Sequence, residues 1–320
     1  MKRSASRPSG AGKARLPLAI AGLTVLAAPS LAAPPPGLPG TMQWMDGPVR
    51  EGGMVAFVDP ASLAWQPFAR WPGVEVRVLS EDPASGRLAV QARFPAGWRG
   101  GPLQATTQSI EIVMLEGGLG FGADTLGRYD FAFVPPGVAP PALGSAAGAR
   151  AFLFFDPPAP DAAAVQRQRG RGAYVSRFDP ARWQPASVAR SAGATADLKV
   201  MHLKKDPFTS ARTWYVRLEG GMKVPWEVHS MVEEGVLMEG RYRLAECLPG
   251  RTVIGEYGAE GYFWRPGGIP HSGPESGPPA GGATAIWLQR SPIALDVVFY
   301  GGCAAGTPQA PVAPAAQARP

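Results

Sequence analysis

Histidine and cysteine are scarce in this chain, whose 320 residues include three histidines and two cysteines. With so few histidine bases, a serine or cysteine catalytic triad is poorly supported. The two cysteines lack metal-ligand spacing to each other or to a histidine, which disfavours a zinc site built from thiolates. No glycine-rich phosphate loop follows a strand pattern, so nothing indicates nucleotide binding.

Excess positive charge is also missing from most of the chain. The formal net charge is +6, but residues 1–32 contain five lysines and arginines and no acidic residue. The remainder therefore carries +1 (6 − 5). Because so little charge is left to neutralise phosphates, we expect no nucleic-acid partner.

Residues 1–32 have the pattern of an export signal. A basic start precedes an apolar run at 16–28, and a Ser-Leu-Ala sequence at 30–32 resembles a cleavage site. The apolar run is shorter than the roughly 20 residues that span a bilayer, so we expect cleavage rather than a stable membrane anchor. An uncleaved anchor is the alternative. A periplasmic or secreted protein would follow.

Glycine and proline are abundant, at 41 and 36 residues, which implies many tight turns and favours short strands over long helices. Apolar and polar residues alternate at 74–80, 88–94, 110–115 and 213–218, and no long amphipathic helix is evident. Such short strands, separated by turns, are typical of an all-β sandwich or barrel.

The chain contains an internal repeat. Residues 58–67 resemble 178–187, and Asp82-Pro83 and Gly97 match Asp206-Pro207 and Gly221 at one offset of 124. Two copies of one domain are the simplest explanation.

The repeat, together with the composition of the remaining stretches, predicts six segments along the chain. They are a signal at 1–32, a flexible leader at 33–43, a first domain at 44–155, a linker at 156–176, a second domain at 177–303 and a disordered tail at 304–320. The linker carries Arg167, Arg169 and Arg171, which we interpret as a solvated segment. A site for an acidic partner is the alternative.

The second domain has a metal-site layout. Glu227 and His229 are two apart, so on a strand both can face one cavity. Glu233 opens the next apolar run, and His271 follows a Pro-Gly turn. Two imidazoles and two carboxylates suit iron, manganese or zinc.

The spacing from Gly221 to Gly240, followed by Pro266, Gly268 and His271, resembles the two signature motifs of the cupin superfamily. One position departs, because Glu227 stands where those motifs have a histidine, and Glu275 replaces an asparagine often found after the second motif. The amino-acid sequence in and around these motifs is similar to that of the cupin domain of ChrR-type zinc-dependent anti-sigma factors and to that of uncharacterised secreted bicupins. The resemblance implies two tandem double-stranded β-helix (jelly-roll) domains.

Only the second copy keeps these residues. Glu227, His229 and His271 align with Leu103, Ala105 and Pro140, while Glu111 aligns with Glu234. We therefore expect the first domain to bind no metal. Glu227 itself can be a ligand, a residue that orients His229, or a surface acid, and Glu234 is an alternative to Glu233.

Further residues are candidates around this site. Tyr262, Trp264 and Arg265 precede the second motif, and we predict that they contact a substrate, the arginine by holding a carboxylate; barrel core is the alternative. We expect His202 in the core or at the surface. Cys247 and Cys303 predict one disulfide in an oxidising compartment, with two buried thiols as the alternative.

The functional prediction is a metal-dependent small-molecule binding or sensing protein. A dioxygenase or isomerase acting on a small organic acid is the alternative, because open coordination positions would admit a substrate. A third hypothesis is an exported protein that binds no metal and acts by interacting with other proteins. By analogy with other cupins, a homodimer is expected.

Overall fold

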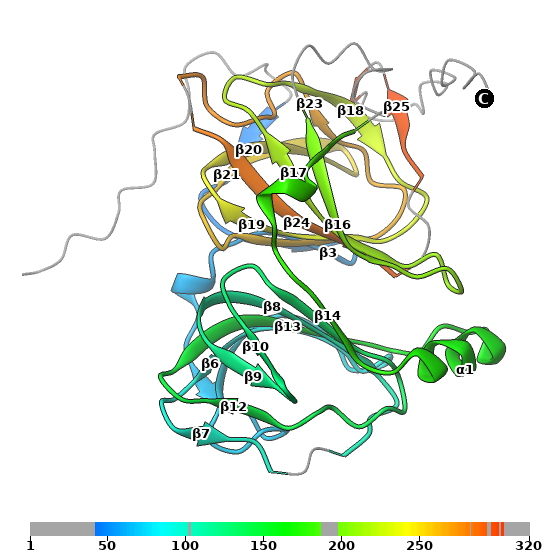
Figure 1. Cartoon of the computed structure of the whole chain (residues 1–320). Coiled ribbons are helices and arrows are strands. Elements are labelled where there is room, and N and C mark those ends of the chain that lie inside the picture. Colours follow the sequence, from blue (N-terminus) through cyan, green and yellow to red (C-terminus); the bar gives the residue numbers. More distant parts are fainter. Residues whose placement is uncertain are drawn as a thin grey trace, which may run out of the picture. The chain divides into compact units, whose positions relative to one another are not determined.

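The computed structural model describes residues 42–101, 104–186, 198–281, 283–292, 296–300 and 302–303. The predicted signal, nearly all of the predicted leader and the predicted tail lie outside these residues. Within them strands predominate, which confirms the all-β prediction (Figure 1). No described helix has the length and apolar character needed to cross a bilayer.

The first half of the chain supplies most of two sheets. The larger one has the order β14 (Tyr174–Ser176), β11 (Phe131–Val134), β8 (Ser109–Gly117), β13 (Ala149–Asp156), β6 (Arg87–Phe94), β5 (Glu75–Asp82) and β4 (Gln66–Pro67). The smaller one has the order β10 (Asp124–Leu126), β9 (Leu119–Phe121), β12 (Leu143–Ser145) and β7 (Trp98–Arg99).

The second half repeats this plan. Its larger sheet has the order β15 (Gln184–Pro185), β16 (Lys199–Lys205), β17 (Arg212–Leu218), β24 (Ala285–Ser291), β19 (Glu233–Glu239), β22 (Tyr262–Arg265), β3 (Met54–Val58) and β2 (Val49–Glu51). The other has the order β1 (Met42–Trp44), β21 (Arg251–Tyr257), β20 (Tyr242–Leu248), β23 (His271–Gly273), β18 (Val224–Val228) and β25 (Val298–Tyr300). The matching strand orders confirm two tandem jelly-roll domains.

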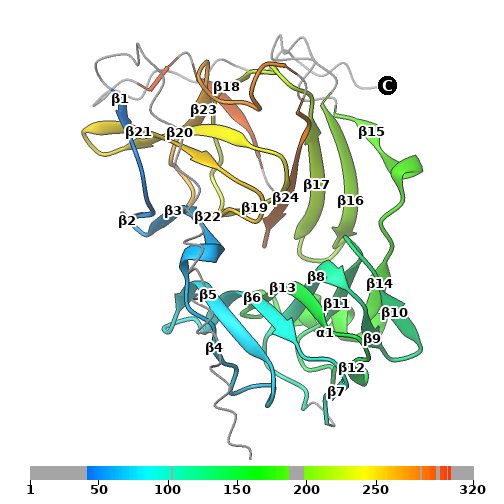
Figure 2. The ribbon, with the colours of Figure 1, turned by 90° about the vertical axis from the view of Figure 1, so that its left-hand side faces the viewer.

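The two halves exchange strands. β3 pairs with β22 of the second domain, whereas β14, which follows the first domain in sequence, pairs with β11. In Figure 2 the blue strands β1, β2 and β3 accordingly lie beside the yellow and orange strands of the second domain. Each exchanged strand covers a sheet edge that would otherwise be unpaired. Residues 44–58 therefore belong by hydrogen bonding to the second domain, which corrects the first-domain boundary at 44.

The segment predicted as a solvated linker is partly structured. Helix α1 (Ala162–Arg171) begins after Asp161, whose side chain accepts hydrogen bonds from the backbone of Ala163 and Ala164. The Arg169 side chain donates to the carbonyl of Pro136 at 2.7 Å. The sequence pattern missed this helix because its apolar face is small, with only three buried residues.

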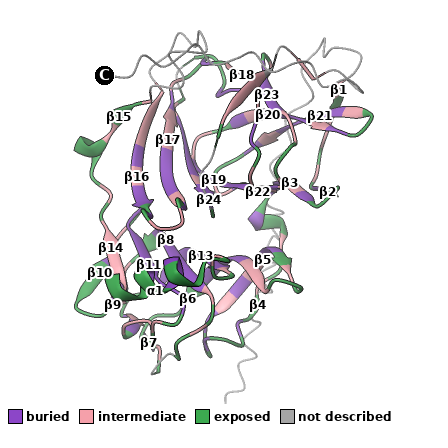
Figure 3. Ribbon diagram, turned by 90° about the vertical axis from the view of Figure 1, so that its right-hand side faces the viewer, coloured by how far each residue is buried: buried purple, intermediate pink, exposed green. Residues whose placement is uncertain are grey.

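The two larger sheets face each other across a shared apolar core. Residues from both domains form one buried cluster, including Phe131 and Phe152 from the first domain and Tyr215 and Leu288 from the second. The strands that meet there are mostly coloured as buried in Figure 3. This contact fixes the two domains against one another through hydrophobic burial.

A buried ionic network crosses this core. Arg290 donates from Nε to Glu111 at 2.9 Å and also binds Glu234, so it joins corresponding carboxylates of the two repeats. Lys204 binds Glu111 as well, and Thr213 donates to it at 2.8 Å. Although burial opposes ionisation of Glu111, the charges of Arg290 and Lys204 lower its pKa to about 2.

We predict that Glu111→Ala lowers the free energy of unfolding by about 3–5 kcal/mol, because it leaves Arg290 and Lys204 buried without this partner. The contribution of Glu111 should be present above its unfolded pKa of 4.5 and be lost as the pH falls toward 2. Chemical denaturation at several pH values measures both effects.

A matched control is Glu116→Ala, which removes a carboxylate that is 59% exposed and paired with Arg150. Its effect should be small because exposed ion pairs contribute little. Equal losses for the two variants would contradict the role given to Glu111.

Candidate metal centre

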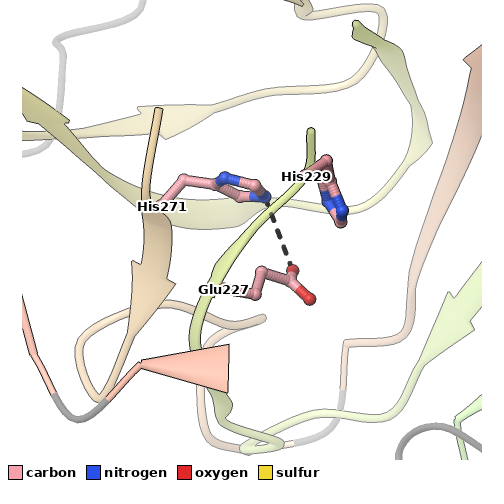
Figure 4. Close-up of side chains that lie close together, drawn as sticks. All are labelled: Glu227, His229 and His271. Atoms are coloured by element: carbon pink, nitrogen blue, oxygen red, sulfur yellow. Dashed lines mark ion pairs between the residues drawn. The ribbon is translucent and has the colours of Figure 1, made fainter. Parts of the chain in front are cut away.

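Three structural elements bring the predicted ligands together. Glu227 lies on β18, His229 follows that strand directly, Glu233 begins β19 and His271 begins β23. β18 and β23 are antiparallel neighbours with Glu227 opposite His271. Figure 4 shows the side chains of Glu227, His229 and His271 converging, with a dashed line that marks the close approach of Glu227 to His271.

The donor atoms are spaced as ligands of one ion would be. The Nε2 atom of His271 lies 3.6 Å from Oε1 of Glu227 and 3.4 Å from Oε2 of Glu233. The same Glu233 oxygen lies 3.6 Å from Nε2 of His229. With metal–ligand bonds of about 2.0–2.2 Å, neighbouring donors in a tetrahedral site are about 3.4 Å apart. Glu227, His229 and His271 thus form a group that could hold one cation, with donor atoms all within 4.8 Å of one another. Glu233 lies beside both histidines of this group.

Both imidazoles are oriented by backbone carbonyls. The Nδ1 atom of His229 is 2.5 Å from the carbonyl of Asp296, and that of His271 is 3.0 Å from the carbonyl of Ile269. Because a carbonyl only accepts, each Nδ1 must donate, which leaves a lone pair on each Nε2. Among the described residues the buried Nε2 of His229 has no hydrogen-bond partner. This orphaned atom fits a metal ligand.

Burial sets the protonation of the neighbouring groups. Burial lowers the pKa of His271 well below its usual value, and the charge of Arg265 acts in the same direction, which favours the neutral, metal-binding imidazole. Burial also raises the pKa of Glu227, whose side chain is 19% exposed. Ser272 donates to Glu227 at 3.2 Å. This location argues against the alternative of Glu227 as a surface acid.

Glu233 and Glu234 face opposite sides of β19. Glu233 lies at the ligand cluster, whereas Glu234 binds Arg290 and accepts a hydrogen bond from Tyr262 at 2.6 Å. Strand alternation explains the difference. The structure therefore brings Glu233, and not the alternative Glu234, to this site.

Arg265 is a buried cation that holds Glu233 in place. Its guanidinium binds Glu233 through Nη1 and Glu246 through Nε at 2.8 Å, and also through Nη2. Burial disfavours its charge, but Glu246 and Glu233 outweigh this and raise its pKa. The sequence prediction had Arg265 hold a substrate carboxylate, but this side chain is already bound to two protein carboxylates.

The other two predicted substrate residues face away from the site. Tyr262 is buried in the core between the domains, and Trp264 packs against that core with Arg87 4.4 Å from its ring centroid. Neither lines the cavity beside the ligands, whereas Phe263 and Arg265 do. The sequence predicted that side chains alternate along β22, but not which of them face the cavity. The predicted substrate contacts of Tyr262 and Trp264 are therefore corrected.

A cavity of about 450 Å³ adjoins the ligand cluster. Its wall includes Trp214, Trp287, Gln289 and His202, none of which was predicted to contact a ligand. Burial, together with Lys205 and other positive neighbours, lowers the pKa of His202 to about 4, so this imidazole is neutral. The volume is within the range of about 300–1,000 Å³ typical of small-molecule pockets.

Cys247 and Cys303 form a disulfide with a Cα–Cα distance of 5.9 Å. Cys247 lies on β20, and its backbone N–H donates to the carbonyl of Pro270, next to His271. The disulfide thus joins residue 303 to the strand that borders the ligand-bearing β23.

The described residues of the first domain differ from the second at the positions of the candidate ligands. Ala105 is exposed, and Leu103 lies outside the described residues. By strand pairing, Ile110 and Val134 occupy the positions of Glu233 and Arg265, and both are buried in an apolar core. Side chains such as Phe94, which belong to this core, leave the first domain with a hydrophobic interior.

The fold, but not the sequence, is similar to that of solved proteins. A variant of oxalate decarboxylase from Bacillus subtilis has 14% identity and a TM-score of 0.53, over 82% of this chain and 81% of that one. A protein from Nostoc punctiforme named as a candidate dioxygenase has 14% identity and a TM-score of 0.51, over 77% and 86%. No protein-family profile and no curated protein sequence matches the chain. The chain thus shares the fold of two tandem double-stranded β-helix domains with these proteins, and these likenesses show the fold alone.

We predict that Arg265→Met lowers the free energy of unfolding by about 3–5 kcal/mol, because Glu246 and Glu233 would keep buried charge without their partner. Thermal or chemical denaturation measures the loss. Adding Glu246→Met should recover part of it, since the second change removes the unpaired carboxylate.

The control is Arg241→Met, at a side chain that is 58% exposed and pairs with Glu256. It should change stability little. If Arg265→Met behaved in the same way, the buried triad would not have the stabilising role described here.

Proposed function

We propose that this protein is an exported bicupin that binds one divalent metal ion in its second domain and acts as a metal-dependent small-molecule binding or sensing protein. The observation that carries the proposal is the convergence of Glu227 with two oriented imidazoles, beside Glu233. Within the described part of the chain, the buried His229 Nε2 has no hydrogen-bond partner.

Glu227, His229, Glu233 and His271 would hold the ion. Two imidazoles and two carboxylates suit iron, manganese or zinc. When bound, the ion would supply a Lewis-acid centre at one end of the cavity. The chain's own residues orient this centre, since two backbone carbonyls fix the histidines and Arg265 fixes Glu233.

The sensing role is supported by the resemblance of the motif region to the cupin domain of ChrR-type anti-sigma factors, where the metal is structural or regulatory. A dioxygenase or isomerase acting on a small organic acid is the second candidate. The cavity favours it, because a substrate there would adjoin the ligand cluster. A homodimer remains a prediction.

Export is supported by two independent features. The first is the signal-like pattern of residues 1–32, and the second is the Cys247–Cys303 disulfide, a bond that persists in oxidising compartments.

We predict that the protein recovered from the periplasm or medium lacks the first 32 residues or close to that number and contains no free thiol. Intact mass spectrometry with and without thiol alkylation measures both. A full-length, alkylated protein confined to the cytoplasm would contradict export.

The metal proposal predicts about one equivalent of iron, manganese or zinc in the purified wild-type protein and its loss in His229→Ala and His271→Ala, because each variant removes one donor. Elemental analysis of protein of known concentration measures the content. Circular dichroism checks that each variant is folded.

His202→Ala is the matched control, because His202 is the remaining histidine and lies in the cavity wall but outside the ligand cluster. It should retain the metal. A wild-type protein that holds no metal even after reconstitution, or variants that keep it, would overturn the proposal. Oxygen uptake or turnover of organic acids that disappears in His229→Ala would favour the enzyme over the binding protein.

A further inference from the structure

One row of side chains spans the cavity wall formed by the eight-stranded sheet. Cross-strand pairing places His202 beside Trp214, Trp214 beside Gln289, Gln289 beside Gly235 and Gly235 beside Phe263. All but Gly235 are cavity-lining residues. A side chain at Gly235 would overlap the ring of Phe263, so this glycine lets the ring lie across the row.

The wall is aromatic and firmly packed. Trp287 contacts the rings of Tyr242, Tyr257 and Phe263 with centroid separations of 5.4, 5.2 and 5.5 Å. Trp214 and Trp287 are 8% and 3% exposed. Such a surface favours a flat apolar ligand, because aromatic contacts add to the gain from burial.

Within this apolar wall, two polar atoms lack partners. Among the described residues, Oε1 of Gln289 and Nδ1 of His202 are buried and make no hydrogen bond. An unsatisfied buried polar atom costs about 1–3 kcal/mol. The amide oxygen of Gln289 can only accept, so it calls for a donor on the ligand.

The charges near the cavity disfavour a dianion. Glu227, Glu233 and Glu246 are three carboxylates, and Arg265 is bound to two of them. A divalent cation would bring these four groups to neutrality, so together they would exert no net attraction on a dianion. Arg212 also lines the cavity, with its guanidinium 5.7 Å from the ring centroid of Trp214.

We propose that the cavity takes a largely apolar, aromatic ligand with at most one negative charge, bearing a metal-binding oxygen at one end and an N–H or O–H group that donates to Gln289. The inference rests on the proposed metal site for the oxygen end of the ligand. The aromatic part of the ligand is inferred from the cavity wall alone and does not depend on the metal site. A small dicarboxylate is the ligand class that it excludes.

The test compares three probes by calorimetry on metal-loaded protein whose metal content is measured in the same sample. Benzohydroxamate and acetohydroxamate share a chelating group and differ in the aromatic ring, and oxalate is the small dicarboxylate. Benzohydroxamate should bind about 10- to 100-fold more tightly than acetohydroxamate, because the ring adds several buried carbons. Oxalate should bind more weakly than benzohydroxamate.

Two tryptophans on opposite faces of the same sheet provide matched variants. Trp214→Ala should remove most of the advantage of benzohydroxamate, whereas Trp264→Ala, on the face toward the first domain, should preserve it. Equal affinities for the two hydroxamates, tighter binding of oxalate, or equal effects of the two variants would overturn the inference.

A second binding experiment, which needs no metal, distinguishes failure of this inference from failure of the proposed function. Benzamide, which has an aromatic ring and N–H donors but no strong chelating group, should bind folded His229→Ala more tightly than acetamide does, and Gln289→Leu should weaken that binding several-fold. If the wild type holds no metal but benzamide shows this preference, the metal proposal fails and the aromatic class stands. If metal is present and benzamide shows no preference, the aromatic class fails alone.

Discussion

Two neighbouring carboxylates on β19, each bound by a buried arginine, connect the candidate metal centre to the domain interface. Glu233 faces the cavity and binds Arg265, and Glu234 faces the first domain and binds Arg290. The period of two along a strand makes this division obligatory. Since breaking either buried pair would leave an uncompensated charge, both arginines constrain the position of β19. The backbone that places Glu233 beside the candidate ligands is therefore held from both faces of its sheet.

The repeat shows which of these constraints belongs to the fold and which belongs to the site. Glu111, the counterpart of Glu234, is retained and shares Arg290 with it. At the position of Glu233, however, the first domain has Ile110 in its apolar core. Where the second domain has an ion pair facing its cavity, the first domain has hydrophobic packing, while both domains have a carboxylate facing the interface. Through this interface, Glu111 of the first domain helps to hold Arg290, which binds Glu234 on β19 of the second domain.

Local patterns in the sequence were enough to predict the strands, the repeat and the ligand cluster. Glu227, His229 and His271 carried fixed spacings, and the structure brings their donor atoms together, with Glu233 next to both histidines. The register of β22 was beyond such reasoning, because a shift of one residue exchanges the two faces of a strand. For this reason Tyr262 and Trp264 were assigned to the wrong side, although Phe263 and Arg265 lay between and beside them.

The features that were missed depend on contacts distant in sequence. Asp296 binds His229 through a backbone carbonyl, which no residue pattern can reveal. Strand β3 precedes the first domain in sequence but pairs with β22, some 200 residues later, at the edge of a sheet of the second domain. Glu246 is separated from Arg265 by 19 positions and lies on the opposite sheet, yet a buried arginine beside one ligand carboxylate needs a second carboxylate. A search for an acidic residue at a buried strand position would have found Glu246. The orientation of the ligands is thus fixed mainly by partners that the motif does not contain.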